Sequence, residues 1–166
     1  CAEWLIASRY TSTKQISIMG GSAGGIMVGR AITERPDLFG AAVDQVPSSD
    51  TLRSEFSPAG PPNIPEFGSV TTEDGFKALL AMSPYNAIKD SVKYPAVLLT
   101  TGINDPRVDA WEAAKMAARL QAASVSGRPI LLRIDYDTGH GYGSTKKQNY
   151  DARADELTFL LWQAGL

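Results

Sequence analysis

Short apolar runs recur along the sequence and predict strands. The run at 94–100 is almost unbroken, which is typical of a parallel strand covered on both faces. Segments with helical spacing follow several of these runs, and such alternation favours right-handed crossovers and a parallel sheet. The predicted strands are 14–19, 41–46, 94–100 and 129–136. The pattern therefore predicts an α/β protein with a parallel sheet of about four strands flanked by helices.

Helical patterns occupy much of the chain between these runs. Residues 110–123 give the clearest one, because Ala, Leu, Met, Glu, Lys and Arg fill most of its positions. Asp109, followed three residues later by Glu112, has the form of a capping box and predicts that this helix begins there. Further helices are predicted at 2–10, 26–32, 74–82 and 144–163. No capping residue precedes the first of these, so we expect the chain to be a piece of a longer protein.

Residues 47–93 form an irregular excursion between two predicted strands. Prolines interrupt this segment repeatedly, and only 74–82 has a clear helical pattern. A connection of this length is usually functional, so we expect it to shape the substrate site. Phe56, Phe67 and Tyr85 are candidates for lining an acyl pocket, although aromatic residues in such segments more often seal a loop against the core.

The composition is that of one globular domain spanning residues 1–166, with 43% hydrophobic and 20% charged residues. The net charge of −2 and the mixed signs leave no basic patch, so neither nucleic acid nor an anionic membrane is expected as a partner. No apolar run approaches the roughly 20 residues that span a bilayer. A single cysteine, Cys1, and a single histidine exclude an internal disulfide and the usual zinc sites, so no metal or cofactor is predicted. The compartment stays undefined.

A nucleophile motif stands after the first predicted strand. Residues 20–24 read Gly-Gly-Ser-Ala-Gly and fit the pattern G-x-S-x-G, with a strand before them and a helix after them as that pattern requires. The turn forces strained backbone angles on Ser22, so its neighbours must be small. The helix directs its N-terminal amides toward the site, and the N–H of Ala23 is the expected oxyanion donor. Dinucleotide and phosphate-loop motifs do not fit this spacing.

The base and the orienting acid follow from chain order. A serine hydroxyl needs a base, and His140, in the glycine-rich loop 138–143 after the fourth predicted strand, is the one histidine. Asp105 directly follows the most apolar strand and is the preferred acid. The rival Asp109 is assigned to the helix cap, and the other acids considered are Asp135 and Asp137, close to His140 in sequence, and Asp44, inside a strand. The order Ser22, Asp105, His140 is that of α/β hydrolases.

Several longer motifs resemble the catalytic domain of the prolyl oligopeptidase family of serine peptidases, in order along almost the whole chain. They are Gly-Gly-Ser-Ala-Gly-Gly at 20–25, Glu-Arg-Pro-Asp-Leu-Phe-Gly-Ala at 34–41, Glu-Phe-Gly at 66–68, Ser-Pro-Tyr-Asn at 83–86, Asn-Asp-Pro-Arg-Val at 104–108 and Gly-His-Gly at 139–141. The resemblance implies a partial α/β-hydrolase fold, acyl-enzyme chemistry at Ser22, and hydrolysis of short peptides or, in some members, of esters.

The resemblance also implies parts that this sequence does not contain. Family members carry a β-propeller and several strands ahead of the first predicted helix, and those strands supply the second oxyanion donor. Without a propeller, we expect small activated esters to be favoured substrates. Without upstream strands, the strand at 14–19 is expected to be a sheet edge that invites homo-oligomer formation. The alternative is a catalytically silent piece that mainly self-associates or needs its missing half.

Overall fold

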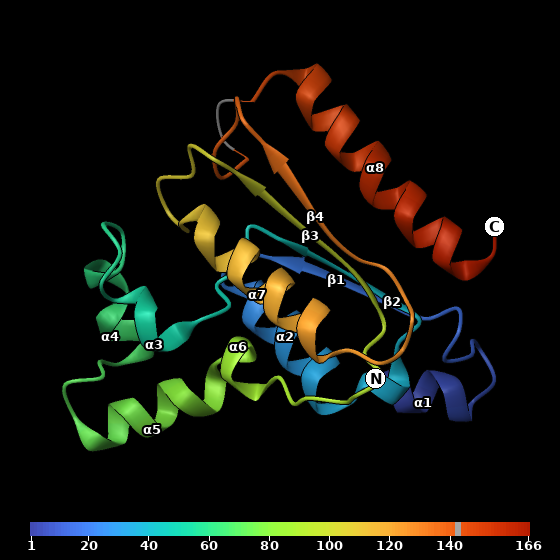
Figure 1. The fold of residues 1–166 in the computed structure, drawn as a ribbon, viewed down its shortest axis with the longest axis horizontal. Coiled ribbons are helices and arrows are strands. Elements are labelled where there is room, and N and C mark those ends of the chain that lie inside the picture. The colour runs from blue at the N-terminus through green and yellow to red at the C-terminus, as the bar shows by residue number, and fades with distance from the viewer. Residues whose placement is uncertain (142–143) are drawn as a thin grey trace.

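The computed structural model describes residues 1–141 and 144–166, and its centre is a parallel sheet (Figure 1). Four strands lie in the order β1-β2-β3-β4, which confirms the predicted α/β class and the predicted parallel sheet flanked by helices. The elements are α1 (Ala2–Ala7), β1 (Ser17–Gly21), α2 (Gly24–Glu34), η1 (Pro36–Leu38), β2 (Ala41–Gln45), α3 (Thr51–Ser54), η2 (Pro61–Asn63), α4 (Ile64–Phe67), α5 (Glu73–Met82), α6 (Pro84–Ala87), β3 (Ala96–Gly102), α7 (Ala110–Ala123), β4 (Ile130–Asp135) and α8 (Lys146–Ala164).

The strand boundaries differ from the predicted ones at the ends. Strand β1 begins at Ser17 because residues 12–16 form a turn, in which the amides of Gln15 and Ile16 both donate to the Ser12 carbonyl. It continues to Gly21, which pairs with Gln45 of β2. Strand β3 begins after Pro95 and likewise extends beyond its predicted end, to Gly102. Both strands therefore extend further at their carboxyl ends, where the loops that carry the candidate site residues begin.

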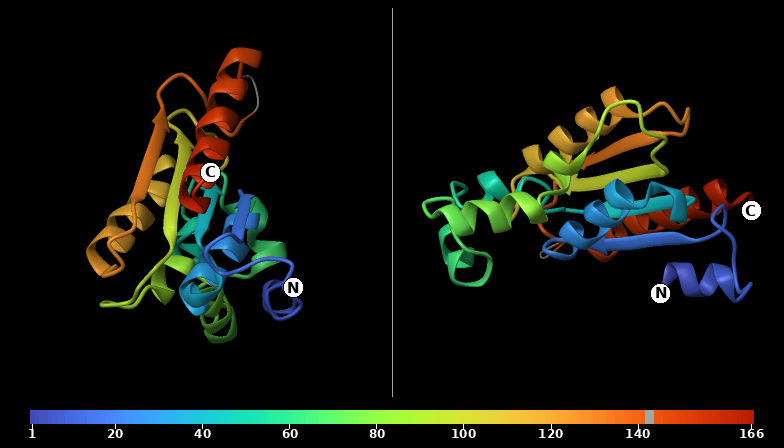
Figure 2. Two further views of the ribbon diagram at one scale, coloured as in Figure 1. Left: turned by 90° about the vertical axis from the view of Figure 1, so that its right-hand side faces the viewer. Right: turned by 90° about the horizontal axis from the view of Figure 1, so that it is seen from below.

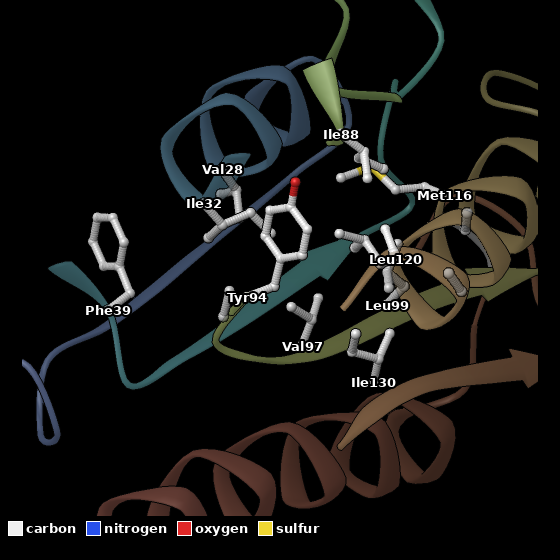
Figure 3. Close-up of a cluster of buried hydrophobic side chains, with 14 residues drawn as sticks. Val28, Ile32, Phe39, Ile88, Tyr94, Val97, Leu99, Met116, Leu120 and Ile130 are labelled. Carbon is white, nitrogen blue, oxygen red and sulfur yellow. The ribbon is translucent and has the colours of Figure 1, made fainter. Parts of the chain in front are cut away.

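Helices cover both faces of the sheet (Figure 2). On one face, α2 packs on β1 and β2, and α7 packs on β3 and β4, whereas α8 lies on the opposite face against β2 and β3. The core follows this division, because successive residues of a strand point to opposite faces. Val97 and Leu99 join the cluster beneath α2 and α7 (Figure 3). Ala96 and Leu98 join the cluster beneath α8.

The excursion 47–93 contains more helix than the sequence predicts. Helix α5 confirms the predicted segment, but α3, η2, α4 and α6 add single turns that have too few residues to show a period. Helices α3, α4 and α5 lie beyond the end of the sheet at which β2 finishes (Figures 1 and 2). The excursion therefore lies next to the carboxyl ends of the strands, where ligands bind in open α/β sheets.

The capping box predicted at Asp109 and Glu112 does not form. Helix α7 does begin after Asp109, but the Asp109 side chain makes no capping hydrogen bond, and Glu112 points its carboxylate to another segment. A complete capping box is present instead at α8, between Thr145 and Gln148. Part of the predicted loop 138–143 lies outside the described residues, namely 142 and 143. Within the described ranges, no helix is both long and apolar enough to cross a membrane.

Asp44 is an ionisable residue in the middle of the core. It lies in β2, is 0% exposed, and neither of its carboxyl oxygens has a hydrogen-bond partner among the described residues. Burial without a partner raises the pKa of Asp44 well above its usual range, because the interior disfavours the charged form. The folded protein therefore holds this carboxyl in its neutral form at pH values where the unfolded chain ionises it.

We expect Asp44 to make folding stability fall as the pH rises. An unfolded aspartate ionises near pH 4, so above that pH the unfolded state gains about tenfold in population for each pH unit until the native carboxyl titrates. Asp44→Asn should match wild type near pH 4 and be the more stable protein at pH 8. Urea unfolding at several pH values measures this. Asp90→Asn, at a 76% exposed carboxylate, is the control, and identical pH profiles for all three proteins would contradict the prediction.

Candidate active site

Ser22 lies in a sharp turn between β1 and α2. Its φ angle is 57°, in the left-handed region that L-residues other than glycine rarely adopt. The Ser22 amide donates to the Gln45 carbonyl at 2.9 Å, and the Ser22 carbonyl accepts from the amides of Gly25 at 2.9 Å and Ser48 at 3.1 Å. Both ends of the residue are thus bonded to the chain that leaves β2, which holds the strained conformation in place.

The packing around Ser22 requires glycine at some positions of the motif and not at others. A Cβ atom at Gly20 would lie 2.8 Å from Cγ2 of Val28, and one at Gly21 would lie 2.7 Å from the Gln45 carbonyl oxygen. A Cβ at Gly24 would meet no described atom within 4 Å. At Gly25, by contrast, it would lie 2.7 Å from Oδ1 of Asp44. On the helix side of Ser22, the position that packing restricts to glycine is therefore Gly25, which lies outside the five-residue pattern, and not Gly24.

The structure brings Ser22, His140 and Asp105 together in one hydrogen-bonded series. The distance from His140 Nε2 to Ser22 Oγ is 2.9 Å, and the distance from His140 Nδ1 to Asp105 Oδ2 is 2.7 Å. The side chains of His140 and Asp105 are 6% and 0% exposed, so solvent competes little for these bonds. A carboxylate can only accept, so Nδ1 donates to it and Nε2 is left to accept from the Ser22 hydroxyl.

Asp105 is fixed by the backbone of its own loop. Its Oδ1 accepts the amides of Arg107 at 2.8 Å and Val108 at 2.9 Å, which leaves Oδ2 for His140. Of the other acids considered, Asp135 uses its Oδ1 to accept the Asp137 amide at 3.0 Å. The loop before Asp105 also contacts the histidine loop, since the Asn104 amide donates to the Thr138 carbonyl at 3.1 Å. The two loops therefore position each other.

A cavity of about 110 Å³ opens beside Ser22. Most of its lining is polar, and of the three aromatic residues expected to line an acyl pocket only Phe67 contributes to it. Phe56 is 68% exposed, and the centre of the Tyr85 ring lies 4.1 Å from Lys115 Nζ. The lining residues are Ser22, Ala23, Ser48, Ser54, Ser57, Asn63, Glu66, Phe67, Arg107, Val108 and Glu112. Ala23, the expected oxyanion donor, thus borders the cavity next to Ser22.

Sequence reasoning missed two residues of this site. Ser48 holds the Ser22 carbonyl, and Glu112 is a buried carboxyl group in the cavity wall. Burial raises the pKa of Glu112, although the hydrogen bonds that it accepts oppose the shift. No cluster of three or more potential metal ligands occurs in the ranges 1–141 and 144–166. The arrangement offers proton transfer and nucleophilic attack.

The arrangement of these three residues is that of the α/β-hydrolase class. The serine lies in a tight turn between a strand and a helix, and the acid and then the histidine follow on loops after later strands. The sequence model of the prolyl oligopeptidase family matches residues 1–166. The chain belongs to that family, which confirms the resemblance seen in its motifs.

Individual relatives agree with this assignment. Prolyl endopeptidase of Dictyostelium discoideum is 35% identical over 96% of this chain and 21% of the relative. A solved prolyl endopeptidase superposes with a TM-score of 0.94 at 37% identity, over 99% of this chain and 24% of that chain. Oligopeptidase B from Leishmania major gives a TM-score of 0.93 at 28% identity, over 99% and 23%. The chain therefore spans between a fifth and a quarter of the length of these relatives.

We predict opposite outcomes for alanine at the two neighbouring glycines of α2. Gly25→Ala would press a methyl group against Asp44 and Pro47, and such overpacking costs about 1–3 kcal/mol. Gly24→Ala has open space and replaces glycine in a helix, where alanine is favoured by about 1 kcal/mol. Urea unfolding of both variants measures the difference. The packing argument is wrong if Gly25→Ala is as stable as Gly24→Ala.

Proposed function

We propose that this chain is a serine hydrolase that cleaves small carboxylic esters and short peptides through an acyl-enzyme on Ser22. The observation that supports this most directly is the hydrogen-bonded series from Ser22 Oγ through His140 to Asp105. Membership of a serine peptidase family supports the same reaction class. The roles of base for His140 and of orienting acid for Asp105 are part of this proposal.

Acylation begins when His140 Nε2 takes the proton from the Ser22 hydroxyl as Oγ attacks the substrate carbonyl. Asp105 holds the imidazole through Nδ1 and stabilises the imidazolium that forms. His140 then returns the proton to the leaving alcohol or amine as its bond to the acyl carbon breaks. His140 then takes a proton from water as the water oxygen attacks the acyl carbon, and it gives that proton to Ser22 Oγ as the bond between Oγ and the acyl carbon breaks. This step releases the acid and regenerates Ser22.

The oxyanion of the tetrahedral intermediate needs donors on the side of the Ser22 turn. Ala23 is the N-cap of α2 and borders the cavity, so its backbone N–H is the donor that we assign. The positive end of the dipole of this 11-residue helix favours the same negative charge. In a measured case, one oxyanion donor accounts for roughly 10² to 10³ in turnover, so one donor alone supports slow catalysis.

Activated esters are the substrates that we expect to react fastest. A nitrophenolate leaves without needing a proton, whereas an amine must be protonated by His140 as it leaves, so an ester depends less on a complete site. Two of the relatives are named prolyl endopeptidase and dipeptidyl aminopeptidase BI, which supports peptides as the second substrate class. Phe67 and Val108 give the cavity two apolar walls for an acyl group.

Removing either reacting side chain should abolish turnover. Ser22→Ala and His140→Ala are expected to reduce release of p-nitrophenol from a butyrate ester to the background rate, because nucleophile or base is lost. A prolyl amide measured beside it should react more slowly in wild type. A fluorophosphonate probe should label Ser22, as read by mass spectrometry. Labelling at another residue, or unchanged turnover in either variant, would exclude Ser22 chemistry; wild-type turnover no higher than that of Ser22→Ala would favour the catalytically silent alternative.

Self-association through β1 is a second proposal. Strand β1 is the outermost strand of the sheet, and within the described residues its only strand partner is β2. Its other edge therefore offers backbone donors and acceptors to another chain. We expect a homo-oligomer, with light scattering across a concentration series giving a mass above 17.8 kDa. A monomer mass at high concentration would rule this out.

A further inference from the structure

The turn formed by residues 46–50, hereafter the 46–50 turn, connects β2 to the excursion, and its backbone amides donate to three different residues. The Val46 amide donates to the Thr100 carbonyl of β3 at 2.7 Å. Pro47 has no amide hydrogen, and the Ser48 amide donates to the Ser22 carbonyl. The amides of Ser49 and Asp50 both donate to Oε2 of Glu112, at 2.6 and 2.9 Å. Glu112 is therefore the anchor for the end of this turn.

The carboxyl group of Glu112 is buried, and both of its oxygens accept hydrogen bonds from the chain that follows β2. Glu112 is 3% exposed, and its other oxygen, Oε1, accepts from Ser54 Oγ at 3.2 Å. Its backbone carbonyl accepts from Ser49 Oγ at 2.7 Å, so Ser49 is held by both its main chain and its side chain. A buried amide left without a partner costs about 1–3 kcal/mol. Removing the carboxyl group would leave two such amides unpaired.

Glu112 also belongs to the short stretch that carries Asp105. The Glu112 amide donates to the Asp109 carbonyl at 3.0 Å, and the amides of Arg107 and Val108 hold Oδ1 of Asp105. One stretch of eight residues, 105–112, thus bonds to His140 at its beginning and to the 46–50 turn at its end. The nucleophile and the acid are connected through the cavity wall as well as through His140.

We propose that Glu112 is a positioning residue for the acylation of Ser22. It holds Ser49 and Asp50, and thereby places the adjacent Ser48 amide against the Ser22 carbonyl, which fixes the angle of the nucleophile turn. Both Ser48 and Glu112 border the cavity beside Ser22, so a shift of the turn changes the geometry at which the hydroxyl meets a substrate. Misplacement of a reacting group by about 1 Å can cost roughly 100-fold in rate. This inference rests on the proposed function.

The test compares three substitutions of Glu112 on p-nitrophenyl acetate, whose acyl group is too small to fill the cavity. Glu112→Ala should lower kcat by about 10- to 100-fold with KM within about threefold of wild type. Glu112→Gln should stay within about threefold in kcat, because its amide oxygen can accept both backbone amides and its NH2 group can donate to Ser54. Glu112→Asp withdraws the carboxylate by one methylene and should give an intermediate loss, which keeps the test decisive if the alanine variant does not fold.

The control is Tyr94→Phe, at the opposite end of the sheet. The Tyr94 hydroxyl accepts the Lys89 amide at 2.7 Å and donates to the Lys89 carbonyl at 3.0 Å, so this variant also removes hydrogen bonds from a buried side chain to the backbone. It should lower stability in urea and leave kcat unchanged. If Glu112→Asp and Glu112→Ala affect kcat no more than Tyr94→Phe does, Glu112 is a structural residue only and the proposal is overturned.

A spectroscopic readout separates this proposal from the proposed function. The chain has one histidine, so the Hε1 proton of His140 gives a single imidazole resonance of that type. Its chemical shift should change in Glu112→Ala and Glu112→Asp, but not in Glu112→Gln or Tyr94→Phe. Wild-type turnover no higher than that of Ser22→Ala would contradict the proposed function. The His140 resonance would still show whether Glu112 positions the site. An unchanged resonance in the alanine and aspartate variants overturns the positioning role.

Discussion

The backbone of Ser22 is the constraint on which the site depends. A left-handed conformation costs an L-residue roughly 1–2 kcal/mol, and the hydrogen bonds that Ser22 makes to Gln45 and Ser48 contribute about 1 kcal/mol each, so they offset the strain. These bonds exist only because β1 lies in register beside β2 as far as Gly21 and Gln45. The parallel pairing of these two strands therefore does more than form the core. It fixes the backbone conformation of Ser22.

Buried carboxyl groups near the nucleophile turn follow different rules. Asp44 has no partner among the described residues, so burial acts on it alone and favours the neutral acid. Burial raises the pKa of Glu112 as well, but the amides of Ser49 and Asp50 donate to this carboxyl group and oppose the shift. The contrast shows that burial alone does not decide charge. Amides that the chain turns toward a carboxyl group, as it does where strands end and loops begin, oppose the effect of burial on its pKa.

One physical reason explains why the sequence predicted both the sheet and the proximity of Ser22, His140 and Asp105. Apolar runs mark buried parallel strands, and the carboxyl ends of parallel strands lie at one edge, so residues that directly follow those runs come together. Strand ends were less accessible, because pairing of Gly20, Gly21 and Gly102 depends on the neighbouring strand and not on side-chain hydrophobicity. Single-turn helices such as α3 have no period to detect.

Glu112 shows where local pattern misleads. An aspartate three residues before a glutamate at a helix start has the spacing of a capping box, and the helix does begin there. The amides that Glu112 accepts, however, lie 62 and 63 residues away in sequence, and nothing near Glu112 in the chain indicates them. A local bond and a long-range bond compete for the same carboxylate, and in the structure the buried amides of Ser49 and Asp50 donate to it. The long-range hydrogen bonds to Ser49 and Asp50 therefore form in place of the local capping box.

The segment that appears least regular in sequence is thus closely tied to the chemistry. The excursion supplies much of the cavity wall, and its first residues belong to the 46–50 turn, whose Ser48 amide donates to the Ser22 carbonyl. Sheet pairing brings Ser22, Asp105 and His140 near one another. Directional hydrogen bonds from these loops then set the final distances, such as 2.9 Å from His140 Nε2 to Ser22 Oγ. Because a serine hydroxyl reacts only when its proton has an aligned acceptor, the loops decide whether the sheet's approximate placement becomes a working geometry.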